Sequence, residues 1–164
     1  GTLKAPSDVP DCPKPPVGRF RPIRINVGGP AYLGARRELW QADDDVVQGT
    51  PYKTTADISK TDTPELYQSG RWNSGALDYS IAVPNRVYTI TLKLAEPYFT
   101  QPGQRIFDVF VNGELVVPEL DMLSRVAPNE ALDVTFRVTV TSGALALHMV
   151  GRVDDPFLCA VEIE

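Results

Sequence analysis

The sequence is short of the residues on which most enzyme chemistry depends. Its 164 residues include one histidine, His148, and two cysteines, Cys12 and Cys159. Basic residues are in the minority, with 16 lysines and arginines against 21 aspartates and glutamates, for a net charge of −5. Nucleic acids and anionic membrane surfaces need basic patches, so the charge argues against both and suits neutral ligands such as sugars. No apolar run reaches the roughly 18 residues of a membrane-spanning helix, which predicts no membrane insertion.

The rest of the composition is that of an ordinary globular domain. Hydrophobic residues make up 43% and charged residues 23% of the chain, which is long enough to bury one core without the help of metals. The first 22 residues differ, because they carry a cluster of prolines: Pro6, Pro10, Pro13, Pro15 and Pro16. We therefore expect a proline-rich extended leader over residues 1–22 and a folded domain over residues 23–164.

Period-two alternation of apolar and polar residues runs through most of the folded region. It predicts strands over 23–27, 79–83, 88–94, 107–111, 115–117, 134–140, 145–149 and 159–163. Asn112-Gly113 favours a two-residue type I′ hairpin turn, because both central residues of that turn need positive φ. Many short strands with turns between them predict an all-β antiparallel sandwich or barrel. Helical signals are weak, so we expect at most short helical turns, over 34–40 and 121–126.

The longest segment without a clear strand pattern covers residues 30–73. Segments of this length in a compact domain are usually functional loops, so we expect long loops here. The segment holds five large aromatic residues, and both tryptophans of the chain are among them: Tyr32, Trp40, Tyr52, Tyr67 and Trp72.

The two cysteines lie near opposite ends of the chain, and domain termini often lie close together. A Cys12–Cys159 disulfide is one interpretation, and it would stabilise the fold by about 4–5 kcal/mol in the chain-entropy model. It would also imply an oxidising compartment. The alternative is two unpaired thiols, with Cys159 buried as a small hydrophobic side chain.

The case for a catalytic site is weak. His148 has the opposite parity to its apolar strand neighbours and is expected to face solvent. Nucleophile-elbow and phosphate-loop motifs are lacking, and a glycosidase needs two opposed carboxylates, a geometry that the sequence does not show. We predict no enzyme activity and no cofactor. The Asp43-Asp44-Asp45 cluster is either a structural Ca²⁺ site or a solvated acidic turn, and the turn is favoured because the spacing does not match an EF-hand loop.

Two segments carry the residue mixture that a sugar site needs. Aromatic rings stack on the C–H faces of sugars, and polar side chains pair with their hydroxyls. Segments 67–73 and 96–101 combine both kinds of residue. The second contains Tyr98 and Phe99, which as neighbours cannot both face one core from an extended strand. The alternative is that one ring caps the sandwich and the other is an unexceptional exposed residue.

A series of short motifs follows a recognisable order along the chain. They are Ile25-Asn26-Val27-Gly28-Gly29, Trp40-Gln41-Ala42-Asp43, Tyr67-Gln68-Ser69-Gly70-Arg71-Trp72-Asn73, the strand 88–96 with Pro97-Tyr98-Phe99, 103–109 before Asn112-Gly113, Leu120-Asp121-Met122, and 155–163. Together they resemble the malectin domain over about residues 23–164. The resemblance implies a jelly-roll-like antiparallel β-sandwich that binds glucose-containing oligosaccharides or polysaccharides without catalysis. It also implies an extracellular or secretory-pathway location, as a monomer or as part of a larger multidomain protein.

The resemblance also assigns a binding site. The family's adjacent Tyr-Phe pair falls on Tyr98 and Phe99, and its pocket aspartate falls on Asp154. The predicted carbohydrate-binding residues are Tyr52, Trp72, Tyr98, Phe99 and Asp154, with Arg71 and Asn73 assisting. Trp72 stands where the family has a tyrosine, a departure that shifts the expected ligand away from malectin's own disaccharide. The alternative function is a protein- or peptide-binding receptor module or an accessory domain of a larger enzyme.

Several residues of the motifs are expected to be structural. Glu96, Asp108 and Asp121 should pair with loop amides or with Arg105. Trp40 and Asp43 are expected to hold the long segment in place and not to contact the sugar.

Overall fold

The computed structural model describes residues 20–43 and 48–164. The leader predicted over residues 1–22 therefore lies almost wholly outside the described residues, as do Cys12, Asp44 and Asp45. The leader and its boundary with the domain stay predictions. No helix among the described residues is long and apolar enough to cross a membrane.

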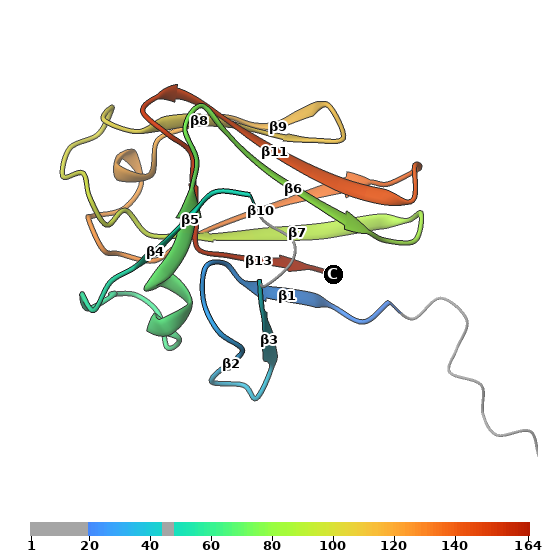
Figure 1. The fold of residues 1–164 in the computed structure, drawn as a ribbon, viewed down its shortest axis with the longest axis horizontal. Coiled ribbons are helices and arrows are strands. Elements are labelled where there is room, and N and C mark those ends of the chain that lie inside the picture. Colours follow the sequence, from blue (N-terminus) through green and yellow to red (C-terminus); the bar gives the residue numbers. More distant parts are fainter. Residues whose placement is uncertain (1–19, 44–47) are drawn as a thin grey trace, which may run out of the picture.

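Two sheets stack face to face, which confirms the predicted sandwich (Figure 1). The larger sheet has the order β10-β7-β13-β1-β3-β2, with β1 Ile23–Asn26, β2 Tyr32–Leu33, β3 Leu39–Ala42, β7 Val87–Leu94, β10 Leu132–Thr139 and β13 Ala160–Ile163. The second has the order β6-β11-β8-β9, with β6 Ala76–Ala82, β8 Ile106–Val111, β9 Glu114–Leu120 and β11 Ala144–Val153. Neighbouring strands are antiparallel, and β1 with β3 is a parallel exception.

A third, smaller sheet has the order β12-β5-β4, with β4 Thr50–Lys53, β5 Ser69–Trp72 and β12 Phe157–Leu158. Its strands come from distant parts of the sequence, because β12 belongs to the last segment of the chain. The prediction of a long strandless segment over residues 30–73 is therefore wrong. β2 to β5 and a short 3₁₀ helix, η1 Pro64–Tyr67, lie within it. These strands escaped detection because they are two to four residues long and do not alternate cleanly.

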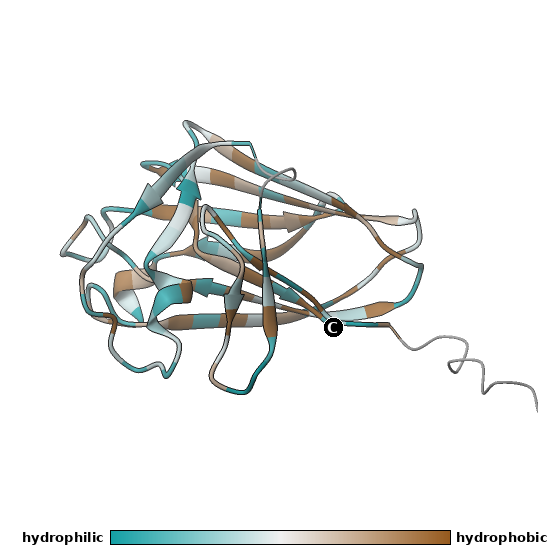
Figure 2. Cartoon of the chain, turned by 60° about the horizontal axis from the view of Figure 1, so that its bottom comes forward, coloured by the Kyte–Doolittle hydropathy of each residue, from teal (hydrophilic) through white to brown (hydrophobic). Residues whose placement is uncertain are grey.

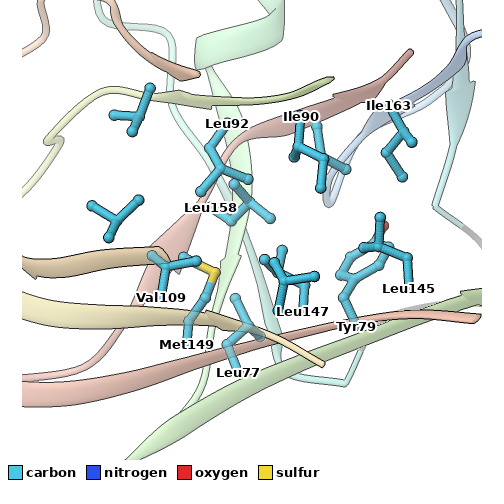
Figure 3. Close-up of a cluster of buried hydrophobic side chains, with 14 of the residues drawn as sticks. Leu77, Tyr79, Ile90, Leu92, Val109, Leu145, Leu147, Met149, Leu158 and Ile163 are labelled. Carbon is cyan, nitrogen blue, oxygen red and sulfur yellow. The ribbon is translucent and has the colours of Figure 1, made fainter. Parts of the chain in front are cut away.

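The core lies between the two large sheets, where the inward-facing positions of the strands meet. Tyr88, Ile90, Leu92 and Leu94 of β7 are all 0% exposed, as period-two alternation requires. Figure 3 shows leucine and isoleucine side chains of β7 pointing toward those of β11 across the interior. Hydrophobic and hydrophilic residues alternate along the strands in Figure 2. Each fully buried aliphatic side chain contributes about 1.5–3 kcal/mol, so this interior is a major source of the stability of the sandwich.

The predicted turns have mixed outcomes. Asn112 and Gly113 have φ of 48° and 82° and join β8 to β9, which confirms the expected hairpin. The turn over 121–126 is confirmed as a 3₁₀ helix, η2 Met122–Ser124. The helical turn over 34–40 is wrong. Gly34 and Glu38 instead close a tight hairpin between β2 and β3, where the Gly34 N–H donates to the Glu38 carbonyl over 2.8 Å.

The remaining strand residues fall as their parity predicts. His148 on β11 is exposed and pairs with Asp78 of the neighbouring β6. Cys159 is fully buried as a free thiol, and its Sγ lies 3.9 Å from the Tyr67 carbonyl oxygen. Burial raises the pKa of the Cys159 thiol to about 12. The structure thus offers no support for the Cys12–Cys159 disulfide, whose other half lies outside the described residues.

Candidate functional site

A buried ion pair organises the loop that follows β7. Glu96 is 0% exposed, and its carboxylate accepts from both Nε and Nη2 of Arg105, at 2.7 and 3.2 Å. The same carboxylate accepts the backbone N–H groups of Tyr98 and Phe99, at 3.2 and 3.0 Å. Two charge-assisted hydrogen bonds from Arg105 and two from backbone amides occupy both oxygens of the carboxylate. Glu96 is therefore structural, as expected, and fixes the backbone of the aromatic pair.

The two rings of this pair have different roles. Tyr98 is 77% exposed, whereas Phe99 is half-buried, so a single ring projects into solvent. Their centroids lie 4.9 Å apart at an interplanar angle of 85°, the edge-to-face arrangement that aromatic quadrupoles favour. Phe99 thus supports Tyr98 from the side, in agreement with the expectation that neighbours cannot share one core face.

Arg105 links the aromatic pair to the end of the chain. Its guanidinium carbon lies 5.1 Å from the centroid of the Phe99 ring and 5.5 Å from that of Phe157. Both distances are within cation–π range. Its Nη1 also donates to the Asp155 carbonyl over 2.7 Å. A single buried side chain therefore holds the loop after β7 against the segment that leads into β12.

Phe157, on β12 of the small sheet, connects Arg105 to the other two strands of that sheet. Tyr52 on β4 meets it edge-on, with ring centroids 5.6 Å apart. Trp72 ends β5 opposite Phe157 of β12 in the strand register, and it is 37% exposed. Tyr52, Phe99 and Tyr98 are thus joined by a series of contacts through Phe157 and Arg105, and Trp72 is paired with Phe157 in the strand register.

Asp154 lies on the turn that leads into β12. It is exposed, with a φ of 58°, and its Oδ1 accepts the Asp155 N–H over 2.8 Å. The Asp155 carboxylate in turn accepts the Gly75 N–H over 3.2 Å, and the Asp155 backbone carbonyl accepts from Arg105. The turn that presents Asp154 is therefore tied to the same arginine as the aromatic pair.

The two predicted assistants, Arg71 and Asn73, have partners inside the fold. Nε and Nη2 of Arg71 donate to the Asp43 carboxylate at 2.8 and 3.1 Å, and Nη1 donates to the Gly49 carbonyl at 2.9 Å. The hydrogen bond to Asp43 raises the pKa of Arg71 above its usual value. Asn73 donates to the Ala76 carbonyl over 2.8 Å. All three guanidinium nitrogens of Arg71 therefore have partners within the fold, and Asn73 uses its amide nitrogen there.

The acidic motif residues Asp43, Asp108 and Asp121 are structural as expected. Asp43 also accepts the Gly28 N–H over 2.6 Å, and Trp40 is 2% exposed. Asp108 accepts the Glu119 N–H, and Asp121 accepts that of Gly103, both at 2.7 Å. The described residues contain no group of three or more His, Cys, Asp or Glu side chains that could hold a metal ion. The engagement of Asp43 by Arg71 gives the calcium interpretation no support.

Sequence reasoning missed two buried residues that support the candidate site. Arg105 was expected only as a partner for carboxylates, and Phe157 was taken only as part of a strand motif. Phe157 lies opposite Trp72, and this position would follow from the sequence if the pairing of β12 with β5 were known. That pairing joins residues more than 80 positions apart, and no local pattern reveals it.

Comparisons with known proteins agree with this arrangement. A family model described as the malectin domain matches residues 22–161. Malectin of Mus musculus is 30% identical over 160 residues, and malectin of Danio rerio is 31% identical over 160 residues. Each alignment covers 85% of this chain but only 55% and 56% of those proteins. The chain therefore spans little more than half the length of these relatives.

Solved structures share the fold at lower identity. The plant receptor-like kinase ANX2 matches with a TM-score of 0.77 and 19% identity, covering 86% of this chain and 46% of that one. A β-glucuronidase of Bacteroides uniformis matches with a TM-score of 0.77 and 18% identity, covering 88% of this chain and 18% of that one. These likenesses concern the fold alone. The family match over most of the described domain, together with the two malectins, shows that the chain belongs to the malectin domain family.

Proposed function

We propose that this chain is a carbohydrate-binding module that performs no chemistry and recognises glucose-containing oligosaccharides. Membership of the malectin domain family supports the class of ligand. Tyr98 and Trp72 offer exposed aromatic faces for the C–H side of a sugar ring, and Asp154 offers an exposed carboxylate for its hydroxyls. Phe99 and Tyr52 border and support these groups. Exposed sugars must lose water to gain hydrogen bonds, so we expect Kd values on the order of 10 µM to 1 mM.

The observation that carries this proposal is the central position of Arg105. It is 9% exposed and joins the loop of Tyr98, the turn of Asp154 and the ring of Phe157. Two segments from distant parts of the chain, the loop 95–105 and the segment 154–157, are therefore held in one arrangement before any ligand arrives. Such preorganisation lowers the entropy lost on binding.

The same contacts argue against hydrolysis at this surface. A glycosidase needs one carboxyl that donates a proton and a second that acts as base or nucleophile. Glu96, the carboxylate nearest to the aromatic pair along the chain, is buried and saturated by four N–H groups. It cannot approach a glycosidic bond without breaking the support of the loop. Recognition without catalysis is the activity that this geometry suits.

Removing single exposed rings tests the site. Tyr98→Ala and Trp72→Ala should each weaken glucose-oligosaccharide binding about tenfold in calorimetry, which corresponds to ~1.4 kcal/mol. Tyr98→Ala with Phe99→Ala should abolish binding. Leu115→Ala on β9 is a matched control, because Leu115 is also an exposed apolar residue, at 46%. Circular dichroism should show the same fold for all variants. Unchanged affinity in the folded double variant would rule out this site.

A second candidate function is protein or peptide binding. It is favoured by the likeness to Receptor-like protein 4 of Arabidopsis thaliana, 27% identical over 135 residues, covering 75% of this chain and 21% of that one. We call the exposed side chains of Tyr98, Trp72 and Asp154 the Tyr98 surface. A glycan array without hits, together with capture of a peptide by the Tyr98 surface, would reverse the ranking. Either function is consistent with our proposal that the domain works outside the cell or in the secretory pathway.

A further inference from the structure

A groove lies away from the Tyr98 surface, on the outer face of the six-stranded sheet. Its volume is about 1040 Å³, and none of the seven predicted sugar-binding residues lines it. Arg24, Lys93, Asp133 and Glu162 form its sheet side, each with the opposite parity to the core residues beside it. η1 and the β2–β3 hairpin border it, and Figure 1 shows both on the side of this sheet that faces away from the four-stranded sheet. The groove is at the upper end of the range for small-molecule sites.

Two buried aromatic residues form the floor of this groove. Trp40 and Tyr67 are 2% and 4% exposed. The Lys93 ammonium lies 5.8 and 5.6 Å from their ring centroids and donates to Asp133 over 2.8 Å. The Tyr67 hydroxyl donates to the other oxygen of the same carboxylate. Aromatic rings and a fixed set of donors and acceptors thus meet at one place.

The charges that line the groove nearly cancel. Four lysine and arginine side chains face five aspartate and glutamate side chains. Two of the cations already have carboxylate partners, in Arg24–Glu162 at 2.7 Å and Lys93–Asp133 at 2.8 Å. A phosphate or other strong anion would meet more carboxylates than free cations. Paired donors and acceptors suit a neutral ligand that carries both on adjacent atoms, as the neighbouring hydroxyls of a sugar do.

One polar atom at this floor lacks a partner. The buried indole Nε1 of Trp40 makes no hydrogen bond to any described residue. Glu38, another lining residue, has a pKa below its usual value, first because of its own backbone N–H and then because the indole N–H of Trp40 lies near its carboxylate, although the two groups do not reach the geometry of a hydrogen bond. A buried donor without a partner has lost its hydration without a hydrogen bond to replace it, which destabilises the fold. Such groups usually bind a water or a ligand atom, so the floor of the groove is incomplete as it stands.

We propose that this groove is a second carbohydrate site, which binds a neutral oligosaccharide independently of the Tyr98 surface. Asp133, Lys93, Arg24 and Glu162 bind its hydroxyls. A small shift of the Glu38 or Lys93 side chain admits one hydroxyl to the indole N–H of Trp40. A module with two such sites on different faces binds a polysaccharide chain more tightly than either site alone, because the second contact is intramolecular.

The two tryptophans of the chain allow the sites to be observed separately. In Trp72→Phe, the remaining tryptophan is Trp40, and its emission reports on the groove alone. Trp72 is partly exposed, so this variant should fold. We would titrate it with maltotetraose, cellotetraose and laminaritetraose, each up to about 10 mM, above the millimolar Kd expected of a weak sugar site. We expect a saturable change in Trp40 emission with at least one of these probes.

Matched variants then assign the signal. In the Trp72→Phe background, Asp133→Asn with Glu162→Gln should weaken the Trp40 titration at least tenfold, whereas Asp78→Asn should not change it. Asp78 is the control because its carboxylate is also exposed and hydrogen-bonded to a neighbouring side chain, that of His148, on the other sheet. Tyr98→Ala should leave the signal unchanged. The proposal is overturned if Trp40 emission responds to no probe, or if Tyr98→Ala removes the response while the groove variant keeps it. A response at Trp40 without oligosaccharide binding at the Tyr98 surface would support this site and reject the Tyr98 surface as the sugar-binding site of the proposed function.

Discussion

Replacement of Arg105 by methionine is the sharpest test of how the Tyr98 surface is held. Methionine keeps much of the side-chain volume but removes the charge. The Glu96 carboxylate, with 1% of its side chain exposed, would then be buried without its cation. Breaking a buried ion pair by removal of one partner costs about 3–5 kcal/mol, a large share of the roughly 5–15 kcal/mol by which a domain is stable.

The expected loss is large enough to measure by urea unfolding. With an m value of about 2 kcal/mol per molar, a loss of 4 kcal/mol lowers the unfolding midpoint by about 2 M. Arg24→Met is the matched control. Arg24 also pairs with a glutamate at 2.7 Å, but both side chains are 23% exposed. Exposed pairs contribute about 0–1 kcal/mol, so its midpoint should move by no more than about 0.5 M.

A double variant separates the ion pair from general packing. Glu96→Gln in the Arg105→Met background removes the unpaired buried charge, while the amide oxygen can still accept from the N–H groups of Tyr98 and Phe99. We expect it to recover a measurable part of the lost stability, so the two changes are not additive. Sugar affinity should remain reduced, because the link to Asp155 and Phe157 is still missing. Equal losses for Arg105→Met and Arg24→Met would refute the reasoning.

The remaining predictions concern stability and reactivity. The backbone N–H of Glu119, and then Arg152, lower the pKa of Asp108 below its unfolded value of 3.8, so its contribution to stability is present above that pH and lost as pH falls through the folded pKa. Urea midpoints should therefore drop in acid, and less so in Asp108→Asn. In Cys12→Ser, the buried Cys159 should resist a thiol reagent at pH 8 in the folded state and react once per chain in guanidinium, whereas rapid native labelling would contradict its burial. Gly113→Ala, with open space around it and a φ of 82°, should cost about 1–2 kcal/mol. Gly28→Ala should cost clearly more by the same assay, because its Cβ would lie 2.2 Å from the Gly70 carbonyl oxygen.

Local patterns identified the long strands because burial on one face imposes period two on the side chains. Residues 88–94 and 134–140 are examples, and both form strands of the six-stranded sheet. The same reasoning failed for β2 to β5. A short strand such as β5, Ser69–Trp72, contains a serine and a glycine at its buried positions, so no apolar alternation marks it. Its strand geometry comes from pairing with β4 and β12, which are distant in sequence.

For the candidate site, the sequence indicated the residue types but not which side chains are exposed or which are bound to other parts of the fold. It indicated Tyr98 and Phe99, because adjacent aromatics in a loop cannot share one core face. It did not show that Tyr98 projects while Phe99 packs against Arg105. It also did not show that the Arg71 guanidinium donates two hydrogen bonds to the Asp43 carboxylate.

By itself, the sequence determined an all-β sandwich, a family, and a set of aromatic and acidic residues suited to sugars. These follow from alternation, turn chemistry and motif order, which are properties of neighbouring residues. Only the tertiary structure decided that Arg105 and Phe157 connect the loop 95–105 with the segment 154–158 and the small sheet, that Cys159 is a buried free thiol, and that Trp40 and Lys93 meet in a second groove. Those facts depend on contacts between segments distant in sequence, which a pattern of near neighbours does not encode.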